Sequence, residues 1–255
     1  MKKFLRLITF SVVGILMFVS CIGVQKPVFS TSYIGGYYEL SHISSSIRET
    51  NIGNEPFIQI SLYPATGDIK MLSDLYYCSK HKHDYDNGKF IEYATAHNDI
   101  NYRKAGHQYP GGLNRCFPVD DFVSIDILCN DDWDNNHPTG SSLKDITQFI
   151  AVSIAPFINT GYKFCDYSSK TLSPFFDKVY PFASADYGER DEYPVDKLLK
   201  DITINDLHLL GCGDRFNPEI NHFCDLFIPV SKHNPESSVT ILITDTAGKI
   251  FNIKK

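Results

Sequence analysis

Two short stretches of the sequence contain side chains that bind metal ions in other proteins. In the first, two imidazoles and two carboxylates lie close together at His81, His83, Asp84 and Asp86. A His-x-His pair on a strand would direct both rings to one face, but spacing fixes no third and fourth ligand. The Asn-Gly pair at 87–88 is also a strong turn signal. We therefore predict a solvated hairpin tip here rather than a metal site.

The second candidate metal site is an acidic loop. Asp132, Asp134 and Asn136 match the first three ligand positions of an EF-hand calcium loop. His137, however, stands where glycine is needed, and Leu143 stands where the loop needs its closing glutamate. The two interpretations are a looser calcium site completed by backbone carbonyls and an acidic turn whose side chains cap the next element. We favour the acidic turn and predict no metal or other cofactor.

No motif of a known catalytic site is present. The sequence contains no Gly-x-Ser-x-Gly elbow, His-Glu-x-x-His helix, phosphate-binding glycine loop or dinucleotide fingerprint. Its 30 Asp and Glu residues leave a hydrolase with an unrecognised carboxylate pair as one alternative, but abundance alone identifies no pair. We therefore expect a binding or scaffolding role rather than catalysis.

Aromatic side chains are the remaining clue to a ligand. The region 175–193 is rich in turns and rings, and the single tryptophan, Trp133, lies in the acidic loop. Exposed rings could stack on the faces of sugars or on a protein partner, whereas core packing is the more ordinary role of such residues. The candidate ligand-contact residues are Trp133, Tyr180, Phe182, Tyr187 and Tyr193.

The first twenty residues indicate export from the cytoplasm. Lys2, Lys3 and Arg6 precede an apolar run that is too short to span a bilayer comfortably, an order typical of a secretory signal. The run ends in Phe-Val-Ser-Cys, which resembles the lipobox of bacterial lipoproteins, with Phe18 in place of the usual leucine. The resemblance implies that Cys21 carries lipid and anchors the chain to a membrane without crossing it. A simple cleaved signal or a short membrane anchor is the alternative.

The remaining cysteines form an even set that suits disulfide bonds in an oxidising compartment. They are Cys78, Cys116, Cys129, Cys165, Cys212 and Cys224. Short loops favour pairing in sequence order (Cys78 with Cys116, Cys129 with Cys165, and Cys212 with Cys224), but loop-closure entropy discriminates weakly among the fifteen pairings. A zinc site that includes His222 is the alternative to the last bridge. We predict a disulfide-stapled domain.

The mature chain is acidic. The signal, residues 1–20, carries three of the 24 basic residues and no acidic one, so 21 basic and 30 acidic residues remain, a net charge of −9. This balance argues against nucleic acid as a partner and against electrostatic attraction to anionic lipid. Residues 21–30 are predicted to be a tether, which lacks the acidic run that accompanies surface export in Bacteroidetes lipoproteins. We expect a lipid-anchored outer-membrane protein facing the periplasm, with the cell surface as the alternative.

Residues 31–255 are predicted to form one domain that is mainly all-β. Alternating apolar residues predict strands at 57–63 and 122–128 and a hairpin over 239–253. A capping box followed by apolar residues at helical spacing predicts a helix over about 142–151. Short strands separated by turns favour a β-sandwich-like domain with one or two short helices.

One part of the chain is similar to known proteins. A strand, an acidic loop, the segment His-Pro-Thr-Gly-Ser-Ser-Leu-Lys-Asp at 137–145 and a closing Asp-x-x-Gly-Lys turn resemble uncharacterised Bacteroidetes envelope lipoproteins. The resemblance covers residues 122–150 and the C-terminal strands, and it implies a β-rich extracytoplasmic domain with no known activity. We predict a lipid-anchored envelope protein with a binding or scaffolding role toward a glycan or an envelope protein. A glycan-binding accessory lipoprotein and a hydrolase are the alternatives.

Overall fold

The computed structural model describes residues 32–64, 70–72, 87–102, 105, 116–180, 189–211, 222–231 and 237–254. Most of its elements are β-strands, and all but one of the strand pairs are antiparallel. The prediction of a mainly β chain is therefore confirmed. None of the described helices is long and apolar enough to cross a membrane.

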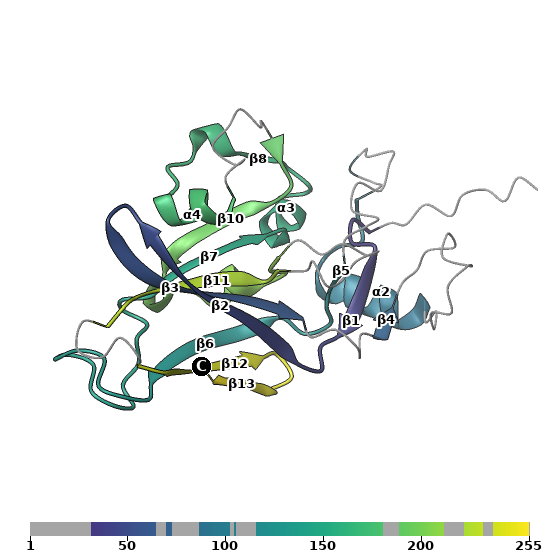
Figure 1. Cartoon of the computed structure of the whole chain (residues 1–255). Coiled ribbons are helices and arrows are strands. Elements are labelled where there is room, and N and C mark those ends of the chain that lie inside the picture. Colours follow the sequence, from purple (N-terminus) through teal and green to yellow (C-terminus); the bar gives the residue numbers. More distant parts are fainter. Residues whose placement is uncertain are drawn as a thin grey trace, which may run out of the picture.

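The larger of the two main sheets has five antiparallel strands in the order β10-β7-β11-β3-β2 (Figure 1). The strands are β2 (Ile43–Ile52), β3 (Glu55–Pro64), β7 (Gln148–Ser153), β10 (Tyr193–Leu198) and β11 (Cys224–Pro229). The predicted alternation in β3 is confirmed, because Ile58, Ile60 and Leu62 all enter one core. Gly53 closes the β2–β3 hairpin with a φ of +62°, a conformation that glycine adopts without a steric penalty.

The second main sheet has three antiparallel strands in the order β13-β12-β6. They are β6 (Phe122–Cys129), β12 (Val239–Asp245) and β13 (Ile250–Lys254), which confirms the predicted strand and C-terminal hairpin. The largest core is shared by the two sheets, with Ile60, Phe149 and Leu226 from one and Ile127 and Ile241 from the other. Burying each side chain of this size stabilises the fold by about 1.5–3 kcal/mol. We call these two sheets the two-sheet body.

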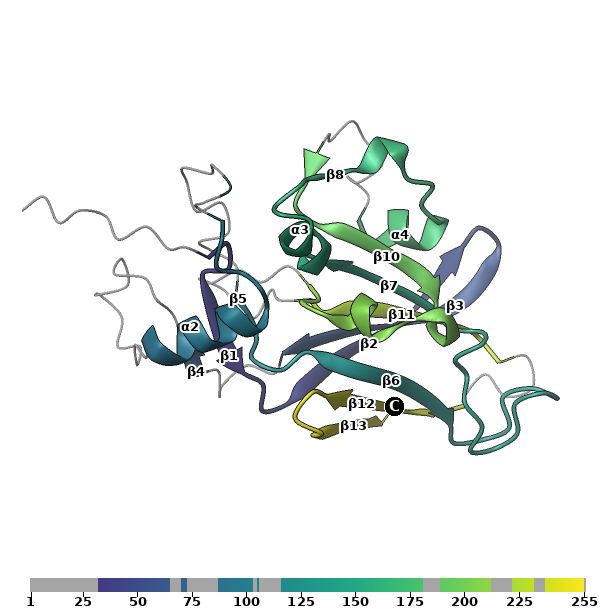
Figure 2. The same ribbon diagram turned by 180° about the vertical axis from the view of Figure 1, so that it is seen from behind.

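A smaller unit, the side lobe, lies at one side of the two-sheet body in both views (Figure 1, Figure 2). It contains β1 (Gly36–Glu39), β4 (Lys70–Leu72), β5 (Cys116–Pro118) and helix α2 (Asn87–Ala96). β1 pairs antiparallel with β4 and parallel with β5. Phe90 and Ala94 of α2 share a core with Tyr37, Phe117 and Phe157, and this core joins the side lobe to helix α3 (Ala155–Asn159).

Short elements connect the main strands, and they pack partly on the outer face of the five-stranded sheet and partly on the other two cores. They are α3 (Ala155–Asn159), β8 (Cys165–Asp166), η2 (Tyr167–Ser169), α4 (Pro174–Val179), β9 (Glu189–Arg190), η3 (Leu199–Asp201) and η4 (Ile204–Leu207). Ser173 caps α4 by accepting a hydrogen bond from the backbone N–H of Phe176 at 3.3 Å. Phe176 then packs with Phe57, Ile150 and Phe227 in a third core.

The helix predicted over 142–151 is wrong. The chain makes a turn there and then enters β7. Both residues of the expected capping box bond elsewhere, because Ser142 Oγ donates to Asp126 at 2.7 Å and Asp145 accepts from His137 at 2.9 Å. β7 pairs on both edges, with β10 and β11, and is buried on both faces. These tertiary contacts override the local helical pattern.

The turn predicted at residues 87–88 is also wrong. Asn87 and Gly88 begin α2, whereas the expected metal ligands at 81–86 lie outside the described residues. The helix is fixed by Phe90 and Ala94, which stand four positions apart on one helical face and are both 1% exposed. Burial of this face stabilises the helix more than the Asn-Gly pair, a purely local signal, favours a turn.

The predicted disulfide framework is not supported. Cys129, Cys165 and Cys224 are buried free thiols, so the bridges Cys129–Cys165 and Cys212–Cys224 are wrong. Cys129 lies in the core between the main sheets and Cys165 in the core on the outer face, so the five-stranded sheet separates them. The thiol of Cys129 instead donates to the carbonyl oxygen of Pro138 at 3.1 Å. Cys78 and Cys212 lie outside the described residues.

Candidate functional site

A pocket of about 370 Å³ lies where α2 of the side lobe meets the two-sheet body and α3. Its size falls in the range of small-ligand sites. Five separate parts of the chain line it, and the residues are Glu92, Tyr93, Ala96, His97, Asn98, Val119, Asp120, Asp121, Ala155, Asn159, His208, Leu209 and Thr246. Polar side chains therefore converge on one cavity from elements that are distant in sequence.

A histidine–carboxylate pair forms one wall of this pocket. His97 Nε2 lies 3.2 Å from Asp121 Oδ2, and the two side chains are only 9% and 11% exposed. His97 Nδ1 donates to the carbonyl oxygen of Tyr93 at 2.8 Å, and Asp121 Oδ1 accepts from the backbone N–H of Leu209 at 2.7 Å. Burial lowers the pKa of His97, but the hydrogen bond and charge of Asp121 outweigh it and raise the pKa. The two side chains therefore form an ion pair, which joins the residue that follows α2 to the residue that precedes strand β6 of the two-sheet body.

A buried carboxylate lies behind this wall. α2 ends at Ala96, Asn98 follows it with a φ of +58°, a common conformation after a helix end, and the next residue, Asp99, is 0% exposed. Asp99 accepts hydrogen bonds from the backbone N–H groups of Tyr33 (2.8 Å) and Ile34 (2.7 Å) and from the hydroxyl of Tyr162 (3.1 Å). Burial raises the pKa of Asp99 to about 7. Asp99 thus joins the first described residues to the end of the helix that lines the pocket.

Tyr37 packs between the two acidic groups. Its ring stacks on that of His97 with centroids 5.2 Å apart and an interplanar angle of 17°. The buried hydroxyl of Tyr37 has no hydrogen-bond partner among the described residues. Burial and the nearby charges of Asp99 and Asp121 raise the pKa of Tyr37, so the hydroxyl stays neutral. The stacked ring restricts the rotation of His97.

The remaining polar residues of the lining, which we call the rim, make few hydrogen bonds to other parts of the described chain. Asp120 accepts one hydrogen bond, from Thr246 Oγ1 at 3.1 Å. The side chains of Glu92, Asn98, Asn159 and His208 make no hydrogen bond or ion pair within the described part of the chain. The wall is therefore fixed by its own bonds, whereas the rim presents carboxylate, amide and imidazole groups to a ligand.

A second polar cluster lies on the five-stranded sheet. His222 Nε2 lies 2.6 Å from Asp225 Oδ2, and Asp225 Oδ1 accepts from Gln59 at 2.7 Å and from the hydroxyl of Ser61. Burial raises the pKa of Asp225, but the ion pair with His222 and these hydrogen bonds outweigh burial and lower it. Ser61 donates to the carboxylate rather than to the imidazole, so this is not a nucleophile–base pair. The cluster joins β3 to β11.

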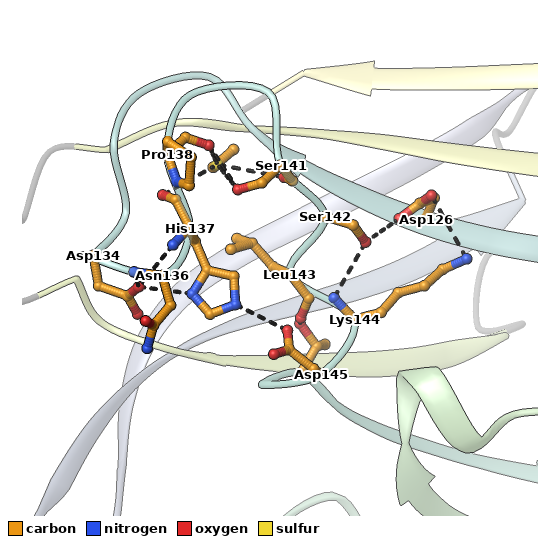
Figure 3. Close-up of polar contacts among 12 residues, drawn as sticks. Asp126, Asp134, Asn136, His137, Pro138, Ser141, Ser142, Leu143, Lys144 and Asp145 are labelled. Carbon is orange, nitrogen blue, oxygen red and sulfur yellow. Dashed lines mark hydrogen bonds and ion pairs between the residues drawn. The ribbon is translucent and has the colours of Figure 1, made fainter.

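The acidic loop is held together by its own side chains. Figure 3 shows His137 lying between two carboxylates, with Nδ1 2.8 Å from Asp134 and Nε2 2.9 Å from Asp145. Asp132 accepts from the backbone N–H of Thr139 at 2.7 Å. The carboxylates that suggested a calcium loop are thus engaged in bonds within the turn.

Of the predicted ligand-contact residues, Trp133, Tyr180 and Tyr193 lie in the described part of the chain, and none of these three lines the pocket. Trp133 is 2% exposed, so the expectation of an exposed ring there is wrong. Tyr180 and Tyr193 are partly buried in the outer-face core, and the Tyr193 hydroxyl donates to the carbonyl oxygen of Lys163 at 2.8 Å. Phe182 and Tyr187, like Cys21, lie outside the described residues.

Sequence reasoning missed the pocket residues because no local pattern marks them. His97 and Asp121 stand 24 positions apart and belong to no motif. Comparison of the chain with protein-family models, with curated proteins and with solved structures found no match. The resemblance to Bacteroidetes envelope lipoproteins stays a prediction, and function is inferred from the residues of this chain.

Proposed function

We propose that this chain is a lipid-anchored protein of the bacterial envelope that binds a small ligand in the pocket between α2 and the two-sheet body. Lipid on Cys21 would hold it at the membrane, and residues 21–30 would tether a β-sandwich-like domain whose two layers are the main sheets. Its role is binding without catalysis.

The pocket is the single observation that carries this proposal. A binding site needs groups that are already fixed in the free protein, because such groups lose little entropy when the ligand binds. It also needs polar groups whose hydrogen-bonding capacity is still available to the ligand, and the pocket has both. His97 and Asp121 are fixed by each other and by the backbone of Tyr93 and Leu209. Glu92 and Asn159 can bond a ligand without first breaking a bond to a described residue.

The same residues favour binding over catalysis. None of the described residues that line the pocket is a serine, cysteine or lysine, the usual nucleophiles of covalent catalysis. Both ring nitrogens of His97 already face oxygen acceptors, so His97 would have to break a bond before it could accept a proton. The hydroxyl of Thr246 donates to Asp120. His97, Asp121 and Thr246 are therefore engaged in bonds that fix the lining.

The glycan-binding alternative receives less support from the described residues. Trp133 is buried, and its backbone N–H donates to the carbonyl oxygen of His137 at 2.8 Å, which fixes it inside the acidic loop. Phe175 packs edge-on against Phe57, with ring centroids 5.0 Å apart. These rings serve the cores and form no platform for a sugar.

Two experiments test the proposal. Metabolic labelling with a fatty acid should mark the wild type and leave Cys21→Ala unlabelled and released from the membrane fraction; equal labelling of both would refute the anchor.

For the pocket, ligand-observed NMR of a library of small polar fragments should detect binders of the wild type that Ala96→Trp no longer binds. Ala96 is an exposed pocket residue of α2, and Ile91→Trp, on the same helix but outside the pocket, is the control. Identical fragment binding by all three proteins would refute the pocket as a ligand site.

A further inference from the structure

We propose that the ligand of this pocket is a small organic cation that carries a primary ammonium group. This inference rests on the proposed function, because it assigns a chemical class to the ligand of the same pocket. The carrying observation is that two carboxylates of the lining, Glu92 and Asp120, have no cationic partner among the described residues.

The charges of the lining do not balance. It contains three carboxylates, on Glu92, Asp120 and Asp121, and the only ion pair among them joins Asp121 to His97 at 3.2 Å in the described part of the chain. Glu92 and Asp120 therefore have no ion-pair partner in the described part of the chain. A cleft with low-dielectric walls concentrates the field of such carboxylates, which attracts cations and repels anions. The acidic mature chain, at −9, strengthens the same preference.

The hydrogen-bonding groups of the rim match an ammonium group. An ammonium has three donors and no acceptor, whereas carboxylates only accept. Glu92 accepts no hydrogen bond from a described residue, and Asp120 accepts only the one from Thr246. The amide oxygens of Asn98 and Asn159 add two neutral acceptors. A diol could use these acceptors too, but it would gain nothing from the two uncompensated charges.

Tyr93 adds an aromatic surface that suits an organic cation. Its ring lines the pocket and lies beside the ring of Tyr37, with centroids 5.8 Å apart. A cation placed over such a ring is attracted by the negative face of its π system. A bare metal ion fits the pocket less well, because no three His, Cys, Asp or Glu side chains among the described residues converge to hold one. The cavity, at about 370 Å³, also has room for a carbon skeleton.

Three probes of equal chain length test the charge preference. Isothermal titration calorimetry on the full-length chain in a neutral detergent would compare 1,4-diaminobutane, 1,4-butanediol and succinate, at low and at physiological salt. The diamine should bind at least tenfold more tightly than the diol or the dicarboxylate, and salt should weaken its binding. Glu92→Gln and Asp120→Asn should each weaken diamine binding about tenfold. Glu49→Gln, an exposed carboxylate of β2 outside the pocket, should change nothing.

The outcomes separate this inference from the proposed function. Diol or succinate binding as tight as diamine binding, and sensitive to Ala96→Trp, would overturn the cation assignment and retain the pocket as a ligand site. Diamine binding that is unchanged in both carboxylate variants would also overturn the assignment. If none of the three probes binds but the fragment screen yields hits sensitive to Ala96→Trp, the chemical class is wrong and the binding role stands. If the fragment screen fails as well, both proposals are refuted.

Discussion

Replacing Asp99 by asparagine should remove a loss of stability that the wild-type protein undergoes as the pH rises from about 4 to 7. The carboxyl of Asp99 is 0% exposed, and burial raises its pKa from 3.8 to about 7 despite three donated hydrogen bonds. In this window the folded protein keeps the proton while the unfolded chain has lost it. The folded state therefore binds more protons, and its free energy of unfolding falls as the pH rises.

The magnitude follows from the two pKa values. A pKa difference of one corresponds to about 1.4 kcal/mol, so a change from 3.8 to about 7 corresponds to about 4 kcal/mol of stability lost across the window. Asparagine has one acceptor oxygen, so it leaves one of the backbone N–H groups of Tyr33 and Ile34 facing its amide nitrogen. This mismatch costs about 1–3 kcal/mol at every pH. The variant should therefore be less stable than the wild type by about 1–3 kcal/mol near pH 4 and more stable than it by about 1–3 kcal/mol near pH 8.

Urea unfolding at several pH values, followed by the fluorescence of the single tryptophan, measures this difference. The free energy of unfolding of the wild type minus that of Asp99→Asn should fall by up to about 4 kcal/mol between pH 4 and 8. Asp201→Asn, an exposed carboxylate in η3, is the control and should track the wild type. A constant difference between wild type and Asp99→Asn over this range would refute the assignment of a raised pKa to Asp99.

Three further predictions concern the acidic loop, the thiols and one glycine. Burial lowers the pKa of His137, but the hydrogen bonds and charges of Asp134 and Asp145 outweigh burial and raise that pKa. The charged imidazole therefore stabilises the folded protein fully below about pH 6.5, and this stabilisation is lost as the pH rises through the pKa of the folded state. Acrylamide quenching of Trp133 should therefore increase above that pKa in the wild type and be high at all pH values in His137→Asn. Unfolding without reductant, followed by alkylation and mass spectrometry, should label the thiols of Cys129, Cys165 and Cys224. Absence of label on all of these cysteines would restore the disulfide prediction. Gly211→Ala should lower the free energy of unfolding by more than about 1 kcal/mol, because φ is +91° and a Cβ would collide with a backbone carbonyl; an unchanged urea midpoint would contradict this.

Strands with one buried face were predictable from the sequence. In β12 the burial alternates strictly between buried and half-buried, as the period of Val239, Ile241 and Ile243 predicts. β7 was not predictable in the same way, because a central strand that is covered on both faces loses the alternation. Its apolar run could be read at helical spacing from Leu143 onward. The local pattern therefore identified strands whose apolar and other residues alternate better than it identified a strand that is apolar on both faces.

The candidate site could not be predicted because its signal is tertiary. His97 looks like any polar residue at the end of a helix, and Asp121 like a turn residue before β6. Only the packing of the side lobe on the body brings them within 3.2 Å and buries both. The reverse error occurred at Trp133, where an acidic neighbourhood suggested exposure, but bonds within the loop fold the ring inward.

Three carboxylates link distant parts of this chain, a role that the sequence pattern predicts for disulfide bonds. Asp99 binds the backbone at 33–34, Asp121 binds the backbone N–H of Leu209, and Asp225 binds β3 through Gln59. The buried thiols meanwhile pack as small apolar side chains within the cores. A covalent bridge is indifferent to pH, whereas the links through Asp225 and Asp99 respond to it in opposite directions. The lowered pKa of Asp225 makes its link weaker on acidification, and the raised pKa of Asp99 makes its site more stable there. Asp121 lines the pocket. Burial lowers the pKa of its partner His97, but the hydrogen bond and charge of Asp121 outweigh burial and raise it, so this ion pair of the pocket wall should be lost as the pH rises through that pKa.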